Sequence, residues 1–60
     1  MKYITVLDFE LGKVYQYKLN VLDKNYDYEL FIDYQGHNLS NCEWMIHSDN
    51  QIIVENGKTE

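Results

Sequence analysis

The stretch YITVLDFELGKVYQYKL, residues 3–19, decides the fold of this chain of 60 residues. Apolar and β-branched residues fill most of positions 3–9, and positions 14–19 alternate aromatic or aliphatic side chains with polar ones. Both patterns predict strands, because successive side chains of a strand point to opposite faces of a sheet. The intervening turn, residues 10–13, contains Gly12, which adopts the positive φ of tight turns without steric cost. We therefore expect a β-hairpin.

A single helix is predicted over residues 24–35. Its apolar stripe recurs at helical spacing and consists of Tyr26, Leu30, Phe31 and Tyr34. Residues three and four apart share one face of a helix, so we expect this stripe to pack on the sheet. Either Asp23 or Asn25 can cap the helix start by accepting a hydrogen bond from a free backbone amide. Gly36 is placed to end the helix in a left-handed conformation.

Two further strands are predicted in the C-terminal third. Residues 37–41 form a polar loop, residues 42–47 a third strand, residues 48–50 a turn and residues 51–55 a fourth strand. Residues 56–60 are expected to form a frayed tail. The resulting fold class is α+β, a four-stranded antiparallel sheet in the order β-β-α-β-β with one helix packed on one face.

Length and composition restrict the domain count and the compartment. Sixty residues make a single small domain, residues 1–60, whose small core calls for further stabilisation. The lone Cys42 excludes an internal disulfide and is typical of a reducing compartment. Asp8 comes too early for the apolar core of a signal peptide, and no run reaches the about 20 apolar residues of a membrane span. We therefore expect a cytoplasmic protein without membrane contact.

The charge balance restricts the partners. Ten acids and five lysines leave a net charge of −5, and the chain contains no arginine. The lysines are dispersed along the sequence, so the basic patch that nucleic-acid binding requires is missing. We expect no direct nucleic-acid binding, and instead contact with a basic surface on another protein.

Three residues, His37, Cys42 and His47, are candidate metal ligands or nucleophiles. Sulfur and imidazole suit zinc, but Cys42 and His47 are five positions apart on a predicted strand and so face opposite sides. The same separation argues against a Cys-His nucleophile pair. We expect no cofactor, no metal site and no catalytic residue, with Cys42 buried beside Trp44. A metal- or thiol-dependent hydrolase is the remaining enzyme hypothesis.

Aromatic residues are the strongest compositional signal. Six tyrosines, two phenylalanines and one tryptophan exceed what one sheet face under one helix can cover. Tyrosine favours interfaces because it combines apolar area with a polar hydroxyl. We expect Tyr15 and Tyr17, with the helix acids Glu29 and Asp33, to bind a partner. The two acids also permit a second hypothesis, in which they imitate the phosphates of a nucleic acid.

A homodimer is predicted because the strands carry apolar residues on both faces. An antiparallel sheet that is open to water on one side should alternate apolar with polar residues, and this one does not. An uncovered second face would leave an apolar patch larger than monomers tolerate. A two-fold contact through sheet surface or strand edge would bury it. The expected interface residues are Ile4, Val6, Met45 and Ile53.

Two parts of the chain resemble short phage-encoded proteins. They are the segments VLDF and GKVY, residues 6–9 and 12–15, and the later segment GHNLSNCEWM, residues 36–45. The chain is similar in length and layout to small phage anti-defence proteins such as the Hachiman inhibitors of Bacillus phages. This resemblance implies a phage or prophage protein, in the host cytoplasm, that blocks a bacterial defence protein by direct binding. The alternative function is an acidic DNA mimic or an antitoxin-like inhibitor of a nucleic-acid enzyme.

Overall fold

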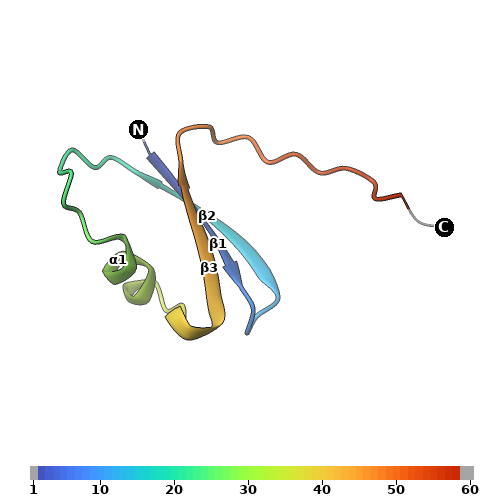
Figure 1. Ribbon diagram of the computed structural model, residues 1–60, viewed down its shortest axis with the longest axis horizontal. Helices are drawn as coiled ribbons and strands as arrows, with labels where there is room; N and C mark the ends of the chain where they lie inside the picture. The colour runs from blue at the N-terminus through green and yellow to red at the C-terminus, as the bar shows by residue number, and fades with distance from the viewer. Residues whose placement is uncertain (1, 59–60) are drawn as a thin grey trace.

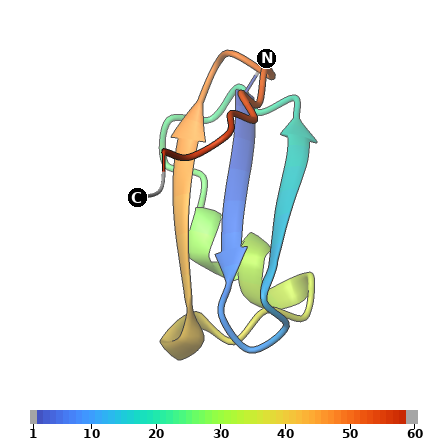
Figure 2. The same cartoon turned by 90° about the vertical axis from the view of Figure 1, so that its right-hand side faces the viewer.

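The computed structural model describes residues 2–58 and places a three-stranded antiparallel sheet under one helix (Figure 1). The elements in chain order are β1 (Lys2–Asp8), β2 (Lys13–Leu19), α1 (Tyr28–Tyr34), a short 3-10 helix (Leu39–Asn41) and β3 (Cys42–His47). β1 lies at the centre of the sheet, and the strand order is β2-β1-β3. Viewed from the side opposite the helix, the sheet lies in front of α1 (Figure 2).

The predicted hairpin is confirmed. β1 and β2 pair antiparallel, and the last pair of the register joins Asp8 to Lys13 across a four-residue connection. Gly12 adopts a φ of 64° in this connection. The carboxylate of Asp8 accepts the backbone N–H of Leu11 at 3.0 Å, which stabilises the turn from within. Local sequence alone therefore specifies this part of the fold.

The predicted fourth strand is wrong. Residues 48–58 contain no helix or strand and extend away from the sheet (Figure 1). A tight reversal after β3 needs residues with positive φ, and within residues 2–58 only Gly12 and Gly36 have one. Instead, the carboxylate of Asp49 accepts the N–H of Gln51 at 2.9 Å and holds an open bend. Positions 59 and 60 of the predicted tail lie outside the described residues.

The predicted fourth strand, residues 51–55, has no alternation of apolar and polar side chains that would turn one of its sides toward the core. Its apolar residues, Ile52, Ile53 and Val54, are consecutive, so no alternation assigns one face to the core. All three side chains are exposed, by 57%, 73% and 90%. The fold is therefore α+β with three strands.

The helix begins later than predicted. α1 starts at Tyr28 because Asp27 caps it, with the Asp27 carboxylate accepting the backbone N–H of Leu30 at 3.0 Å. Asp23, one of the two predicted caps, instead accepts the N–H of Asn25 at 2.9 Å in a separate turn. Three side chains of the Asx type lie in this segment, and local sequence does not rank them as caps.

The apolar face of α1 also differs from the predicted stripe. Ile32 is fully buried, and the side chains of Tyr28 and Phe31 pack beside it. Leu30 and Tyr34, predicted to face the sheet, are 63% and 86% exposed. Tyr28, Phe31 and Ile32 lie at positions i, i+3 and i+4, an equally regular helical stripe. The buried core around this stripe consists of Ile4, Val6, Ile32 and Cys42.

The predicted end of the helix at Gly36 is confirmed. Gly36 has a φ of 97°, and its N–H donates to the carbonyl of Asp33 at 2.9 Å. The N–H of His37 donates to the carbonyl of Ile32 at 3.3 Å. This pair of bonds is the Schellman arrangement, which reverses the chain after a helix. It directs His37 toward the sheet.

Candidate functional site

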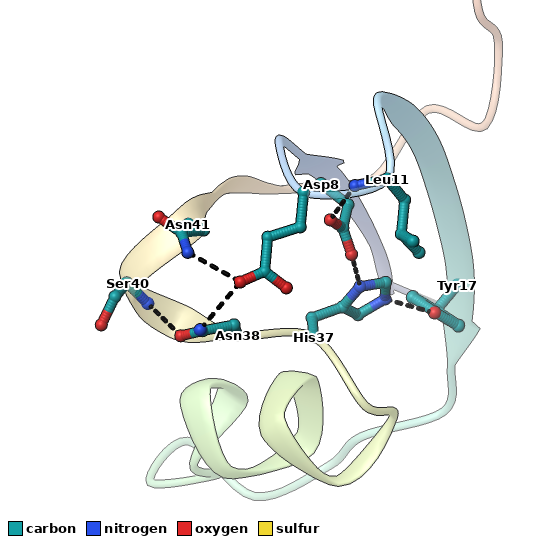
Figure 3. A network of polar contacts seen from close by, with 8 residues as sticks. Asp8, Leu11, Tyr17, His37, Asn38, Ser40 and Asn41 are labelled. Atoms are coloured by element: carbon teal, nitrogen blue, oxygen red, sulfur yellow. Dashed lines mark hydrogen bonds and ion pairs between the residues drawn. The ribbon is translucent and has the colours of Figure 1, made fainter.

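A buried polar network connects the hairpin to the segment after α1 (Figure 3). Asp8 and His37 are only 5% and 4% exposed. Nδ1 of His37 lies 2.6 Å from Oδ2 of Asp8, and Nε2 of His37 lies 2.6 Å from the Tyr17 hydroxyl. The three side chains come from β1, β2 and the residue after Gly36, so the network holds together elements that are distant in the sequence.

The bonding partners define where the protons lie. An ionised carboxylate only accepts hydrogen bonds, so Nδ1 of His37 carries the hydrogen of its contact with Asp8. The hydrogen bond from His37, followed by that from the Leu11 amide, holds the pKa of Asp8 below its usual value. Burial, together with the nearby Tyr15 and Asp8, raises the pKa of Tyr17. At neutral pH the acid is therefore charged and the phenol is protonated.

The network has the connectivity of a general-base relay but not its accessibility. A carboxylate orients an imidazole, and the imidazole contacts a hydroxyl, as in nucleophile-base-orienter arrangements. However, His37 is buried, and the raised pKa of Tyr17 opposes formation of the phenolate. What this geometry provides is a positional constraint between β1, β2 and the end of α1.

A second, exposed set of hydrogen bonds lies next to this network (Figure 3). One carboxylate oxygen of Glu10 accepts hydrogen bonds from the side-chain amides of Asn38 and Asn41, at 3.0 and 2.7 Å. Oδ1 of Asn38 accepts the backbone N–H of Ser40 at 3.0 Å and so begins the 3-10 helix. The hairpin turn is therefore anchored to the segment that leads into β3.

Sequence reasoning missed the partner of His37, although a signal for it exists. Asp8 is two and four positions from Val6 and Ile4, so it shares their face of β1. A carboxylate at a core-facing position requires a hydrogen-bonding partner, because burying it alone is costly. Only the tertiary fold identifies that partner, since His37 is 29 residues away.

The three candidate ligands, His37, Cys42 and His47, do not converge. Cys42 is buried in the core as predicted, and burial raises the pKa of its thiol. His47 lies on the opposite face of the sheet, where its Nε2 contacts the hydroxyl of Thr5 at 2.6 Å. Within residues 2–58, no group of three or more His, Cys, Asp or Glu side chains is arranged to hold a metal ion.

The predicted partner-binding residues divide between interior and surface. Tyr15 and Tyr17 are partly buried between the sheet and α1, and the Tyr15 ring packs edge-on against His37 at 4.8 Å. Glu29 and Asp33 are exposed on α1. Of the four residues, the two helix acids are therefore the more exposed.

An open groove lies beside the start of α1 and has a volume of about 430 Å³. We call it the acidic helix groove; its lining residues are Asp23, Asn25, Tyr26, Asp27, Leu30, Phe31 and Tyr34. Residues 23–34 carry four acids and one lysine, a net charge of −3. Leu30 and Tyr34, which the predicted stripe assigned to the core, therefore form an accessible apolar surface beside carboxylates.

The predicted dimer residues do not share a surface. Ile4 and Val6 are fully buried under α1, whereas Met45 is 60% exposed on the other face of the sheet. Ile53 lies in the extended C-terminal segment and is 73% exposed. A contact between two copies therefore cannot use these four residues together.

Comparison with protein-family models, with curated proteins and with solved structures yields no significant match. In the part of the chain that the structure describes, no helix has the length and apolar character needed to cross a membrane.

Proposed function

We propose that this protein is a small acidic inhibitor that binds another protein through the acidic helix groove. The observation that supports this function is the pairing of exposed apolar side chains with carboxylates along one groove. Leu30 and Tyr34 offer apolar area that the fold does not use, and Asp23 and Asp27 flank it. Aromatic and aliphatic anchors within a charged rim are the usual composition of a protein-binding surface.

The charge of the groove defines the kind of partner. The net charge of −3 on residues 23–34, within a chain of net charge −5, favours a basic surface and accelerates association with it. Proteins that handle nucleic acid carry such surfaces, because they neutralise phosphates with lysine and arginine. The resemblance to phage anti-defence proteins then makes a nucleic-acid-handling bacterial defence protein, in the cytoplasm of the host, the proposed target.

A nucleic-acid mimic is the second candidate, and one observation favours it. Glu29 and Asp33 lie one helical turn apart, and both are exposed. A mimic would be displaced from its target by duplex DNA, and its affinity would fall steeply with salt. An inhibitor that depends on Leu30 and Tyr34 would lose affinity when these two side chains are removed, whereas a mimic would keep it.

The proposal is tested by plating phage on a panel of bacterial strains, each of which carries one defence system and expresses this protein. We expect the wild-type chain to restore plaque formation against one system. The double variant Leu30→Ser, Tyr34→Ala should lose that effect, because a central anchor of an interface typically contributes about tenfold or more to affinity. The matched control is Phe9→Ser, Leu11→Ala, which removes two apolar side chains of similar exposure at the hairpin turn.

Two results would overturn this function. One is the absence of protection against every system of the panel by a folded wild-type chain. The other is equal protection by the wild-type chain and the groove variant, which would place the contact elsewhere on the molecule. Loss of protection in the hairpin control alone would likewise place the contact outside the acidic helix groove.

A further inference from the structure

Within residues 2–58, no helix or strand covers one face of the sheet, although Asp49, Gln51 and Ile52 of the segment after β3 line a hollow at its edge. α1 packs on the face that contains Ile4 and Val6, so the alternate residues of each strand point to the other side. Figure 2 looks onto this side of the sheet, with α1 behind it. We call it the open face; its residues are Tyr3, Thr5 and Leu7 of β1, Val14, Gln16 and Lys18 of β2, and Glu43, Met45 and His47 of β3.

The register arranges these nine residues in three rows across the strands. The rows are Lys18–Tyr3–His47, Gln16–Thr5–Met45 and Val14–Leu7–Glu43. Thr5 lies at the centre of the array. Lys18 and Glu43 therefore occupy diagonally opposite corners, and Val14 and His47 occupy the other two.

The open face carries exposed apolar side chains and is shallowly hollowed. Leu7, Val14 and Met45 are 42%, 59% and 60% exposed. Thr5 and Met45 line two adjoining hollows of about 360 and 200 Å³. Nε2 of Gln16 is buried and lacks a hydrogen-bond partner among the described residues. A surface that covers this face should therefore bring apolar side chains.

The charge of the open face differs from that of the rest of the chain. Its lysine and its glutamate cancel, whereas the whole chain has a net charge of −5. A strongly basic or acidic partner would therefore gain little electrostatic affinity on this face. A second copy of the acidic chain would meet the least charge repulsion here. The acidic helix groove, on the opposite side of the sheet, stays free.

We propose that a second copy of this chain covers the open face, related by a two-fold axis that passes over Thr5 at about 45° to the strands, within about 10° of the Val14–Thr5–His47 diagonal. Rotation about this axis exchanges the other two corners, so Lys18 of each copy meets Glu43 of the other. With strands about 4.8 Å apart and alternate residues about 6.7 Å apart, the exchanged corners coincide to within about 3 Å. The strands of the two sheets then cross at about 90°, one of the two common angles of sheet packing.

The size of the contact sets its strength. Nine residues are fewer than the about 20 to 30 residues a side of a standard interface. The extended segment after β3 projects on the same side as the open face (Figure 1), and Ile52, which lines a hollow of this face with Thr5 and Met45, would contact the second copy. We expect a dimer that dissociates in the micromolar range. The inference is independent of the proposed function.

Sedimentation of the full chain across the micromolar range tests this dimer. The wild-type chain should shift from a species of 7.2 kDa to one of twice that mass as its concentration rises. Glu43→Lys and Lys18→Glu should each raise the dissociation constant about tenfold or more, because each places two pairs of like charges in contact. The double variant that exchanges both charges should restore the wild-type constant.

The matched control is Glu29→Lys, which makes the same charge change on α1 and should leave the dimer intact. Circular dichroism establishes that each variant is folded, as expected for substitutions at exposed positions. A single 7.2 kDa species at every concentration would overturn the dimer. Equal association of the wild-type chain and both single reversals, or no rescue by the double variant, would overturn this orientation of the copies.

Discussion

Nδ1 of His37 lies 2.6 Å from Oδ2 of Asp8, and this contact joins the end of α1 to the end of the central strand. Both side chains are buried, and the other ring nitrogen of His37, Nε2, lies 2.6 Å from the Tyr17 hydroxyl. Among residues 2–58 the buried apolar core consists of four side chains, and the buried contact between Asp8 and His37 adds a polar constraint on where the end of α1 lies against the sheet.

Removal of the imidazole should destabilise the fold strongly. His37→Ala leaves the Asp8 carboxylate buried without its main hydrogen-bond donor, so we expect the melting temperature to fall by roughly 10 °C. Tyr17→Phe deletes only the outer hydroxyl and should cost about 1 kcal/mol. Thermal unfolding monitored by circular dichroism measures both. A smaller loss in His37→Ala than in Tyr17→Phe would contradict the central role of His37.

Acid should weaken the fold in a defined pH window. The pKa of Asp8 is lower in the folded chain than its ordinary value of 3.8, so the folded state binds this proton less readily than the unfolded state. The stabilisation is therefore fully present above pH 3.8 and is lost as the pH falls through the lower, folded value. Urea unfolding at a series of pH values measures it. The variant Asp8→Asn should lack this part of the pH dependence. If its free energy of unfolding fell at low pH as much as that of the wild-type chain, Asp8 would not be the group responsible.

The identity of the buried helix residue can be tested by truncation. Ile32→Ala removes a fully buried side chain and should cost about 3 kcal/mol. Leu30→Ala removes a side chain that is 63% exposed and should cost about 0.5 kcal/mol or less. Chemical denaturation compares the two variants. A larger loss of stability in Leu30→Ala than in Ile32→Ala would instead support the buried stripe that the sequence predicts.

The helix end offers a test of backbone conformation in isolation. A Cβ at Gly36 would meet no atom within 4 Å, so any cost of Gly36→Ala comes from its φ of 97°. We expect a loss of about 1 kcal/mol. Gly57→Ala is the control, because a Cβ there also meets nothing and its φ is not positive. Equal stability of the two variants would show that the turn after α1 tolerates a side chain.

Local patterns determined several features of this protein without any tertiary information. Alternation in residues 3–19, interrupted at Gly12, is sufficient for the hairpin, because strand period and turn conformation are properties of neighbouring residues. Gly36 marks the end of the helix for the same reason. The placement of Cys42 and His47 on opposite faces of the sheet also follows from local sequence, because residues five positions apart on a strand point to opposite sides.

Tertiary structure alone decided the helix face, the number of strands and the pairing of Asp8 with His37. Two regular stripes are possible on α1, and only packing against Ile4 and Val6 selects the one that contains Ile32. The run of Ile52, Ile53 and Val54 has the composition of a strand. It could pair only if a turn after β3 brought the chain back to a free edge of the sheet. Asp8 and His37 are 29 residues apart, and no local pattern can join groups whose contact depends on the path of the whole chain.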